Sequence, residues 1–581
     1  MGDESLKTKV SINATIRATI LARISLVYGA DCAPDIMANV EALLASYDHS
    51  IAPKQCGWSE KDALLITYAD SLVGEQPPLI VLNNFLQQEI GDLITYVHLL
   101  PFYPFSSDDG FAVQDFRAVR PDLGTWDNLI AMSTHYRLVY DAVINHVSES
   151  SNYMQEYRTG NPAFADFFVA LEPDTDTSAV LRTRNLPLLH DYPTHDGVKW
   201  LWTTFSRDQL DLNYANPAVL LEILDVLLFY ARQGASMIRL DAIPYMWKEL
   251  GTSCAHLPQT HELIKLIRDQ YTVVSPHMLL LTETNVPHQE NVTYFGDRGD
   301  EAQMIYNFSL APLILWSLLT GDATALTTWA GGIKWISEHA TYLNITATHD
   351  GIGMRPTEGI LSEAARAKLV QLASEHHGAV TGKRNPDGSI SPYELNLNYF
   401  DAVNDPASDE PVETQIQRFL VSQAIPMALM GIPGIYIHSL LGSRNDTDGV
   451  RRTGMARSIN REQLRIEALS EDLHFSTSLR SRVFTEMKHL LRLRAEQSAF
   501  HPDAAQEIID RGAALFVVLR HNASTQETIV AVHNMTNQPV AVSMIDLGLS
   551  PANDLLTDEY FIKSTIPLAP YQVRWLKKIC P

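Results

Sequence analysis

Three acidic residues, Asp241, Glu283 and Asp350, each stand near the end of a short apolar run, in SMIRLDAI, MLLLTETN and LNITATHDGIG. An ionised carboxylate is costly to bury without a partner, so three of them at the ends of such runs indicate one shared site. The C-terminal ends of parallel strands bring side chains together in this way in a (β/α)8 barrel. Two carboxylates about 5 Å apart can cleave a glycosidic bond with retention, because one attacks the sugar carbon while the other moves the proton.

Eight apolar runs along the chain are typical of the strands that such a site needs. They lie at residues 64–68, 94–99, 138–144, 237–241, 278–283, 304–308, 342–346 and 434–438. Helical patterns, for example at 219–232 and 261–271, separate them. Strands that alternate with helices predict a parallel sheet, and eight of them predict a closed (β/α)8 TIM barrel.

Additional segments surround the predicted barrel. Isoleucines at positions 12, 16, 20 and 24 recur every four residues and predict one apolar helix face, and a second helix is expected at 35–44. Two connections, from about 146 to 216 and from about 351 to 413, exceed the usual βα loop of about 4–6 residues. Beyond about residue 495, short alternating runs such as LFVVL and TIVAVHN predict an antiparallel β-domain.

These patterns predict a TIM barrel with a subdomain inserted after strand 3, a second insertion after strand 7 and a C-terminal antiparallel β-domain. The expected parts are a helical extension (1–60), barrel segments (61–146, 217–350 and 414–495), an inserted subdomain B (147–216), a loop-rich insertion B′ (351–413) and the β-domain (496–581).

The composition of the chain argues against some binding partners and cellular locations. The net charge of −24 repels nucleic acid and anionic lipid, so we expect neither as a partner. The four cysteines, Cys32, Cys56, Cys254 and Cys580, have no metal-ligand spacing and are expected as free thiols. The first residues, MGDESLKTK, contain no apolar signal segment, and no apolar stretch is long enough to span a bilayer. We therefore expect a soluble, cytoplasmic protein.

Four segments follow one another in the order of the motifs of the α-amylase superfamily, glycoside hydrolase family 13. They are DAVINHVS (141–148), IRLDAI (238–243), LTETN (281–285) and ATHDGIG (347–353), and QLDLNYANP (209–217) resembles a fifth motif. LPFYPFSSDDGFAVQDF (100–116) and SPYELNLNYFDAV (391–403) resemble the sucrose phosphorylase subfamily. Within it, TETNVPHQENVTYFG (282–296) and GTSCAHLPQTH (251–261) are more similar to glucosylglycerate phosphorylases than to sucrose phosphorylases.

The resemblance implies roles for the three carboxylates. Asp241 matches the nucleophile, Glu283 the acid/base and Asp350 the third carboxylate, which grips the sugar hydroxyls. Arg239 lies two residues before Asp241 and shares its strand face, where a guanidinium keeps the nucleophile ionised.

The resemblance also implies a binding site for glucose. Asp108 and His146 match the residues that recognise the far hydroxyls, Phe111 the aromatic platform under the ring, and His349 a group on the same edge as Asp350. Asn145 could instead ligate calcium, as in amylases, but no cluster of oxygen ligands accompanies it, so we expect no metal.

The acceptor and phosphate site is implied by fewer residues. Tyr393 and Arg451 are candidates for holding phosphate, because a guanidinium suits a pair of phosphate oxygens. Glu394 stands where sucrose phosphorylases carry Gln, which indicates an altered acceptor site.

The predicted activity is that of a retaining α-glucoside phosphorylase. It would transfer a glucosyl group through a covalent intermediate to phosphate, giving α-D-glucose 1-phosphate, with phosphate as co-substrate and no cofactor. Donors of the glucosylglycerate, glucosylglycerol, sucrose and sucrose phosphate types remain alternatives, as does a hydrolase or transglucosidase on the same fold. A non-catalytic relative usually loses a carboxylate, and this chain keeps all three. The resemblance is compatible with a homodimer.

Overall fold

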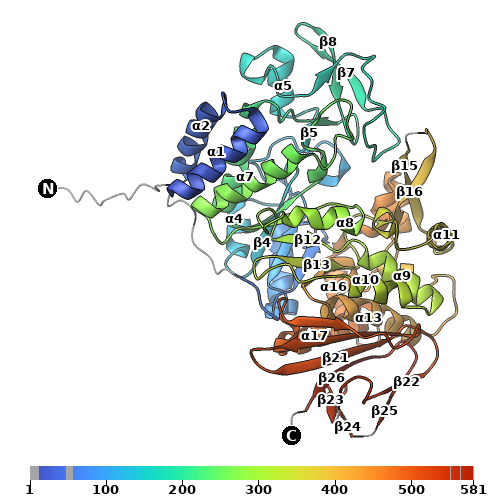
Figure 1. Ribbon diagram of the computed structural model, residues 1–581. Coiled ribbons are helices and arrows are strands. Elements are labelled where there is room, and N and C mark those ends of the chain that lie inside the picture. The colour runs from blue at the N-terminus through green and yellow to red at the C-terminus, as the bar shows by residue number, and fades with distance from the viewer. Residues whose placement is uncertain are drawn as a thin grey trace.

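The computed structural model describes residues 12–47, 51, 57–385, 387–549, 551–562 and 564–579. The barrel occupies the middle of the molecule, the N-terminal helices lie against one side of it, and the C-terminal sheets close one end (Figure 1). Cys56 and Cys580 lie outside the described residues, whereas Cys32 and Cys254 are free thiols. Among the described helices, none has the length and apolarity that a membrane crossing requires.

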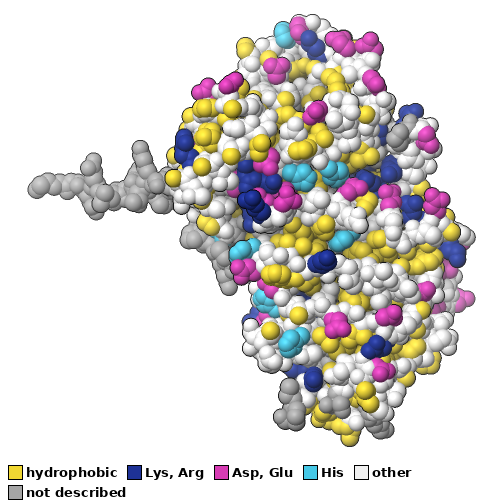
Figure 2. All heavy atoms as spheres, in the orientation of Figure 1, with side chains coloured by type: hydrophobic (Ala, Val, Ile, Leu, Met, Phe, Trp, Pro, Cys, Tyr) yellow, Lys and Arg dark blue, Asp and Glu magenta, His cyan; other side chains and the backbone are white. Residues whose placement is uncertain are grey.

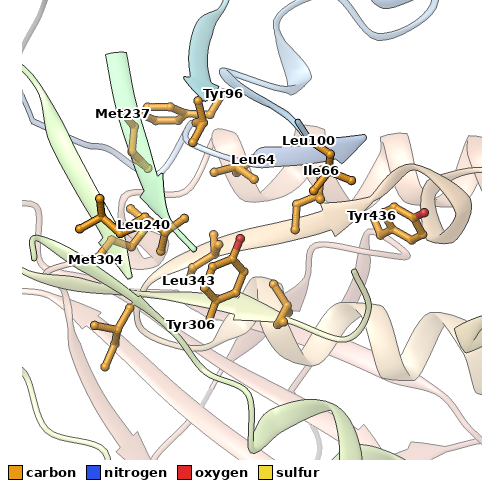
Figure 3. Packing of buried hydrophobic residues seen from close by; sticks show 14 of the residues in the cluster. Leu64, Ile66, Tyr96, Leu100, Met237, Leu240, Met304, Tyr306, Leu343 and Tyr436 are labelled. Atoms are coloured by element: carbon orange, nitrogen blue, oxygen red, sulfur yellow. The ribbon is translucent and has the colours of Figure 1, made fainter. Parts of the chain in front are cut away.

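Eight parallel strands form a closed barrel in the order β1-β17-β13-β12-β11-β10-β4-β3. Their bounds are β1 (Leu64–Thr67), β3 (Tyr96–Leu99), β4 (Arg137–Ala142), β10 (Ala235–Leu240), β11 (Leu279–Thr282), β12 (Met304–Tyr306), β13 (Thr341–Ile345) and β17 (Ile432–Tyr436). Each predicted strand overlaps one of them, so the predicted TIM barrel is confirmed. Leu64, Met237, Leu343 and Tyr436, from four of these strands, belong to one packed cluster (Figure 3). The strands are apolar throughout because both faces of the parallel sheet are covered.

Helices surround the barrel. They include α3 (Pro78–Phe85), α4 (Trp126–Met132), α6 (Pro217–Arg232), α7 (Pro258–Val274), α9 (Leu310–Thr320), α10 (Thr324–Gly331), α12 (Tyr399–Val403), α13 (Val412–Ala428), α14 (Ile437–Leu440), α16 (Ile466–His474) and α17 (Leu479–Ala495). The sequence signals of α6 are clear, because the Asn216 side chain caps its first turn and Pro217 occupies a position where no N–H is needed.

Both predicted insertions are present in the structure. After β4 come β5 (His146–Ser148), α5 (Asn152–Thr159), β6 (Ala170–Leu171), β7 (Leu189–Thr194), β8 (Gly197–Trp202) and β9 (Gln209–Asp211), with β5 paired to β9 and a small β6-β8-β7 sheet between them. After β13 come β14 (Ile352–Gly353), α11 (Glu363–Glu375), β15 (Ala379–Arg384) and β16 (Ile390–Asn396), in a sheet of order β14-β16-β15. Both insertions extend from the carboxyl ends of barrel strands.

The C-terminal part is antiparallel, as predicted. A six-stranded sheet has the order β19-β20-β21-β26-β23-β24, and β22 pairs with β25. The bounds are β19 (Ala505–Ile508), β20 (Leu515–Asn522), β21 (Glu527–Asn534), β22 (Val540–Ser543), β23 (Ala552–Asp554), β24 (Glu559–Phe561), β25 (Thr565–Leu568) and β26 (Val573–Lys578). Val517, Val530 and Ile566 belong to a separate apolar cluster that holds these sheets together.

The predicted N-terminal helices are α1 (Ala14–Tyr28) and α2 (Ala33–Ser46). Ile20 and Ile24 are buried, and α1 packs along α7. Arg23 of α1 forms ion pairs with Asp269 of α7 at 2.8 Å and with Asp300 at 3.2 Å. Lys and Arg side chains lie beside Asp and Glu side chains in this region of the surface (Figure 2). The apolar stripe and these ion pairs attach the extension to the barrel wall.

Candidate active site

The three predicted carboxylates line one cavity at the carboxyl end of the barrel. Asp241 directly follows β10 and Glu283 directly follows β11, whereas Asp350 comes five residues after β13. The Asp241 N–H donates to the Ala142 carbonyl at 3.1 Å and the Glu283 N–H to the Leu240 carbonyl at 3.0 Å, so both residues continue the barrel register for one step. The cavity is open to solvent.

Most of the other predicted site residues line the same cavity. They are Asp108, Phe111, His146, His349, Tyr393 and Glu394. The rings of Phe111 and His349 stack with centroids 4.9 Å apart, and the His146 ring nitrogen Nε2 lies 2.9 Å from the Phe111 carbonyl oxygen. Burial lowers the pKa of His146 and of His349 below the ordinary value, so both imidazoles are neutral near neutral pH.

Arg239 lies beneath Asp241. Its Nη1 is 2.8 Å from Asp241 Oδ1, and the same nitrogen donates to Asp141 on the neighbouring strand β4. His98 Nε2 in turn lies 2.8 Å from the other oxygen of Asp141. Sequence reasoning assigned Arg239 but no role to His98 or Asp141. Asp141 of β4 pairs with Arg239 of β10, and the sequence alone does not show which residues of these two strands are paired.

The electrostatics separate the roles of Asp241 and Glu283. Burial raises the pKa of Glu283, an effect that Arg239 opposes and that Asp350 reinforces. Burial also raises the pKa of Asp241, but Arg239 opposes it through direct contact. Because the guanidinium contacts Asp241 and not Glu283, a proton held by this pair resides on Glu283. The arrangement can therefore present an ionised carboxylate at Asp241 and a protonated carboxyl group at Glu283.

Arg457 lies among the carboxylates that line the cavity. We call Asp108, Asp241, Asp350 and Glu394, together with Arg457, the carboxylate wall. The Arg457 guanidinium lies 3.0 Å from Asp350, 2.9 Å from Glu394 and 3.9 Å from Asp108. Burial acts to raise the pKa of Asp350, but Arg457, His349 and Arg461 outweigh it and hold that pKa below its ordinary value. Asp350 is therefore ionised.

The structure does not bring Arg451 to the cavity, which corrects the predicted phosphate site. The Arg451 side chain is 77% exposed and pairs with Asp448 on the same helix, α15 (Thr447–Thr453). That helix is capped by Gly454, whose left-handed φ of 71° redirects the chain, so that Arg457 enters the cavity three residues after the glycine. The glycine in RRTGMARS is the sequence signal for the end of this helix, and it indicates that Arg451 and Arg457 lie on different elements.

A second group of lining residues, which we call the aromatic wall, consists of Arg184, Phe205, Tyr245, Asn285 and Tyr393. The Arg184 guanidinium lies over the rings of Phe205 and Tyr393, at 5.6 and 5.4 Å from their centroids. Arg184 Nη1 donates a hydrogen bond to the Thr183 carbonyl at 3.4 Å, and no described carboxylate pairs with the guanidinium. Sequence reasoning missed Arg184 because it lies in a long insertion without periodic pattern.

Asn145, for which calcium binding was an alternative, contacts a lysine. Lys248 Nζ donates to Asn145 Oδ1 at 3.0 Å and lies 2.7 Å from Asp211 Oδ2. Within the described part of the chain, no three His, Cys, Asp or Glu side chains gather closely enough to hold a metal ion.

Several non-glycine residues around the cavity have left-handed backbone conformations. Asp108 has φ 55°, Ala242 φ 49° and His256 φ 57°. Such conformations cost about 1–3 kcal/mol each and concentrate at functional sites. Their presence here agrees with a site whose side chains are held in place by the surrounding fold.

Comparison with known proteins identifies the family to which this chain belongs. Residues 87–343 match the family model of the α-amylase catalytic domain. Glucosylglycerate phosphorylases from Allomeiothermus silvanus and Escherichia coli are 44% and 41% identical, over 97% and 90% of this chain and 99% and 92% of theirs. The crystal structure of sucrose 6F-phosphate phosphorylase from Thermoanaerobacter thermosaccharolyticum superimposes with a TM-score of 0.71 at 25% identity, over 84% of this chain and 95% of that one. The chain therefore belongs to the α-amylase superfamily, glycoside hydrolase family 13, and within it to the sucrose phosphorylase subfamily.

Proposed function

We propose that this protein is a retaining phosphorylase that transfers the glucosyl group of 2-O-α-glucosylglycerate to phosphate. The products are α-D-glucose 1-phosphate and glycerate. The observation that carries the proposal is that Asp241 and Glu283 line one cavity and that Asp241 is paired with Arg239. The choice of donor is supported by the two relatives named glucosylglycerate phosphorylase, which are far more similar to this chain than the sucrose 6F-phosphate phosphorylase is.

The reaction is a double displacement. Asp241 attacks the anomeric carbon while Glu283 donates its proton to the glycosidic oxygen, and glycerate leaves. Phosphate then attacks the glucosyl ester from the face that glycerate vacated, which restores the α configuration. Phosphate carries charge at neutral pH and needs less help from a base than water does.

Binding of the sugar falls to the carboxylate wall and its neighbours. Asp108, Asp350 and Arg457 offer acceptors and donors for the hydroxyls, and the Phe111 ring offers an apolar face. His146 and His349, neutral because they are buried, add further polar contacts. Asp350 would bind the hydroxyls more strongly as the ring flattens towards the oxocarbenium ion.

Phosphate must approach a cavity that is lined by five carboxyl groups. Arg184, which has no described carboxylate partner, is the cation best suited to offset that repulsion. Tyr393 can contribute its hydroxyl to phosphate binding.

We further propose that the enzyme uses no cofactor and acts in the cytoplasm, where its anionic products are retained.

The test supplies the purified protein with 2-O-α-glucosylglycerate, with and without phosphate, and quantifies glucose 1-phosphate and free glucose. We expect phosphate-dependent glucose 1-phosphate and little free glucose. Sucrose and glucosylglycerol, offered in parallel, serve as controls for the donor. Free glucose formed at the same rate without phosphate would instead identify a hydrolase.

A further inference from the structure

We propose that Arg355 and His256 form the receptor for the carboxylate of the acceptor, a place that Glu290 occupies in the free enzyme, so that they select glycerate over neutral acceptors. This assignment rests on the function proposed above and adds the residues that determine specificity. Neither arginine of the cavity lining, Arg184 or Arg457, is part of it.

Arg355 is fixed close to the aromatic wall by the backbone around it. It lies five residues after Asp350 and begins a short 3-10 helix (Arg355–Thr357) that follows β14. The N–H of Met354 donates to the carbonyl of Tyr393 at 2.9 Å. Gly353 packs so closely on Asn285 that a Cβ atom at this position would lie 2.4 Å from Asn285 Oδ1. The segment that carries Arg355 is therefore in contact with two residues of the aromatic wall.

The hydrogen-bonding capacity of Arg355 is largely unused. The residue is 8% exposed, and its Nε has no hydrogen-bond partner among the described residues. Its ion pair with Glu290 is long, at 3.5 Å, and the Glu290 side chain is 45% exposed. A guanidinium normally pairs with a carboxylate through two parallel hydrogen bonds of about 2.7–2.9 Å. A buried arginine with one loose partner is suited to binding an anionic ligand.

His256 provides a second donor at the same place. Its Nε2 lies 3.5 Å from the same Glu290 oxygen and has no hydrogen-bond partner among the described residues. Its Nδ1 lies 2.8 Å from the Tyr294 hydroxyl. Burial and the charge of Arg355 lower the pKa of His256 to about 4, so the ring is neutral. If the Tyr294 hydroxyl donates to Nδ1, the proton of the neutral ring is on Nε2 and points towards Glu290.

Glu290 thus stands where a ligand carboxylate would bind, with one oxygen 3.5 Å from both donors. It belongs to the four-residue helix α8 (His288–Asn291), which follows the Glu283 loop directly. Because its side chain is half exposed, it can turn towards solvent when a better-placed carboxylate arrives. Glu290 would then act as a weak internal competitor of the acceptor.

The position relative to the reacting bond fits glycerate. Gly353, two residues before Arg355, packs on Asn285, and Asn285 lies two residues after Glu283 in the lining of the cavity. Arg355 therefore lies on the side of the cavity where Glu283 would protonate the leaving oxygen. In glucosylglycerate the carbon that bears this oxygen also bears the carboxylate. Asn285, whose buried Oδ1 has no described partner, can accept a hydrogen bond from the remaining hydroxyl.

The experiment runs the reaction in reverse, with glucose 1-phosphate as donor and glycerate or glycerol as acceptor. Arg355→Gln should raise the KM for glycerate by about 10- to 100-fold, the range for losing a hydrogen bond to a charged group, and leave the KM values for glycerol and glucose 1-phosphate within about twofold. Arg355→Lys keeps the charge and should recover part of the loss. Arg366→Gln, in the same insertion and 30% exposed, is the matched control and should change nothing.

Glu290→Gln gives an independent measurement, because Glu290 is half exposed and its replacement should leave the fold intact. Removal of the internal competitor should lower the KM for glycerate. A folded Arg355→Gln protein that still prefers glycerate, or that loses both acceptors equally, would overturn the assignment but not the proposed function. A parent enzyme that ignores glycerate as an acceptor would end both.

Discussion

The carboxylate wall and the aromatic wall of the cavity are held in place by different means. On the carboxylate wall the charges are paired within the chain at short distances, as in Arg239–Asp241 at 2.8 Å and Arg457–Asp350 at 3.0 Å. On the aromatic wall Arg184 lies over two rings without a described carboxylate partner, and Arg355, whose preceding residues contact this wall, has one long ion pair. Internal pairing fixes the geometry of a step that every turnover repeats. Cations with one long ion pair or no described carboxylate partner are left available to anions that enter and leave.

The residues proposed to react with the sugar and those proposed to hold phosphate come from different elements. Asp241 and Glu283 directly follow the barrel strands β10 and β11, whereas Arg184 and Tyr393 come from the two insertions. Barrel strands position side chains rigidly, and loops accept changes in sequence at low cost. Relatives with other acceptors can thus keep Asp241 and Glu283 and alter the insertions.

The largest expected effect comes from Asp241→Asn, which removes the nucleophile from the carboxylate wall. Formation of glucose 1-phosphate should fall by about 10⁴-fold, a loss typical of removing a group that acts chemically. The same substitution at Asp448, which is 79% exposed, should leave the rate unchanged. An Asp241→Asn protein with the rate of the parent would exclude the double displacement through this residue.

Arg457→Leu should be the next most damaging change. It leaves Asp350 and the buried Glu394 without their shared cation, which should lower the free energy of unfolding by about 3 kcal/mol. Urea unfolding measures the loss, and kcat/KM should fall with it. Arg452→Leu is the matched control, because Arg452 is 73% exposed and lies 3.9 Å from its partner, Asp446. Equal effects of the two variants would contradict the role given to Arg457.

Glu394→Gln should shift the pH profile rather than abolish activity. The Glu394 carboxylate contributes to the raised pKa of Glu283, so its removal should lower that pKa. Glu283 must be protonated to act as the acid, and it would then lose its proton at a lower pH. We expect the alkaline limb of kcat/KM against pH to move to lower pH, whereas Glu358→Gln should not move it. A shift towards higher pH would contradict the argument.

The smallest effect is expected from Arg451→Ala. Its ion pair with Asp448 is fully at the surface, and such pairs contribute about 0–1 kcal/mol. Phosphate dependence of the rate should be that of the parent, whereas Arg184→Gln should raise the KM for phosphate. A higher KM for phosphate in Arg451→Ala would support Arg451 as a phosphate ligand, as the sequence predicted, and would contradict its exposed position in the structure.

Particular residues explain how far the sequence could predict the fold and the site. Apolar runs that end in Asp241 and Glu283 were visible, because burial and strand period impose a pattern on the chain. Arg451 and Arg457 both occur in RRTGMARSINR, and only the path of the chain after Gly454 decides which of them reaches the cavity. Contacts such as His98–Asp141 depend on barrel register, and Arg184 and Arg355 depend on how loops fold back, so neither leaves a periodic signal.

Lys248 has a consequence for how the insertion after β4 is anchored. Asn145 precedes the first strand of that insertion and Asp211 ends the last, and the Lys248 ammonium contacts both. Because this counter-charge is covalently part of the polypeptide, neither a chelating agent nor dilution can extract it. The junction should therefore keep its shape in media that range from calcium-rich to calcium-free, and the melting temperature should be the same in EDTA as in millimolar calcium.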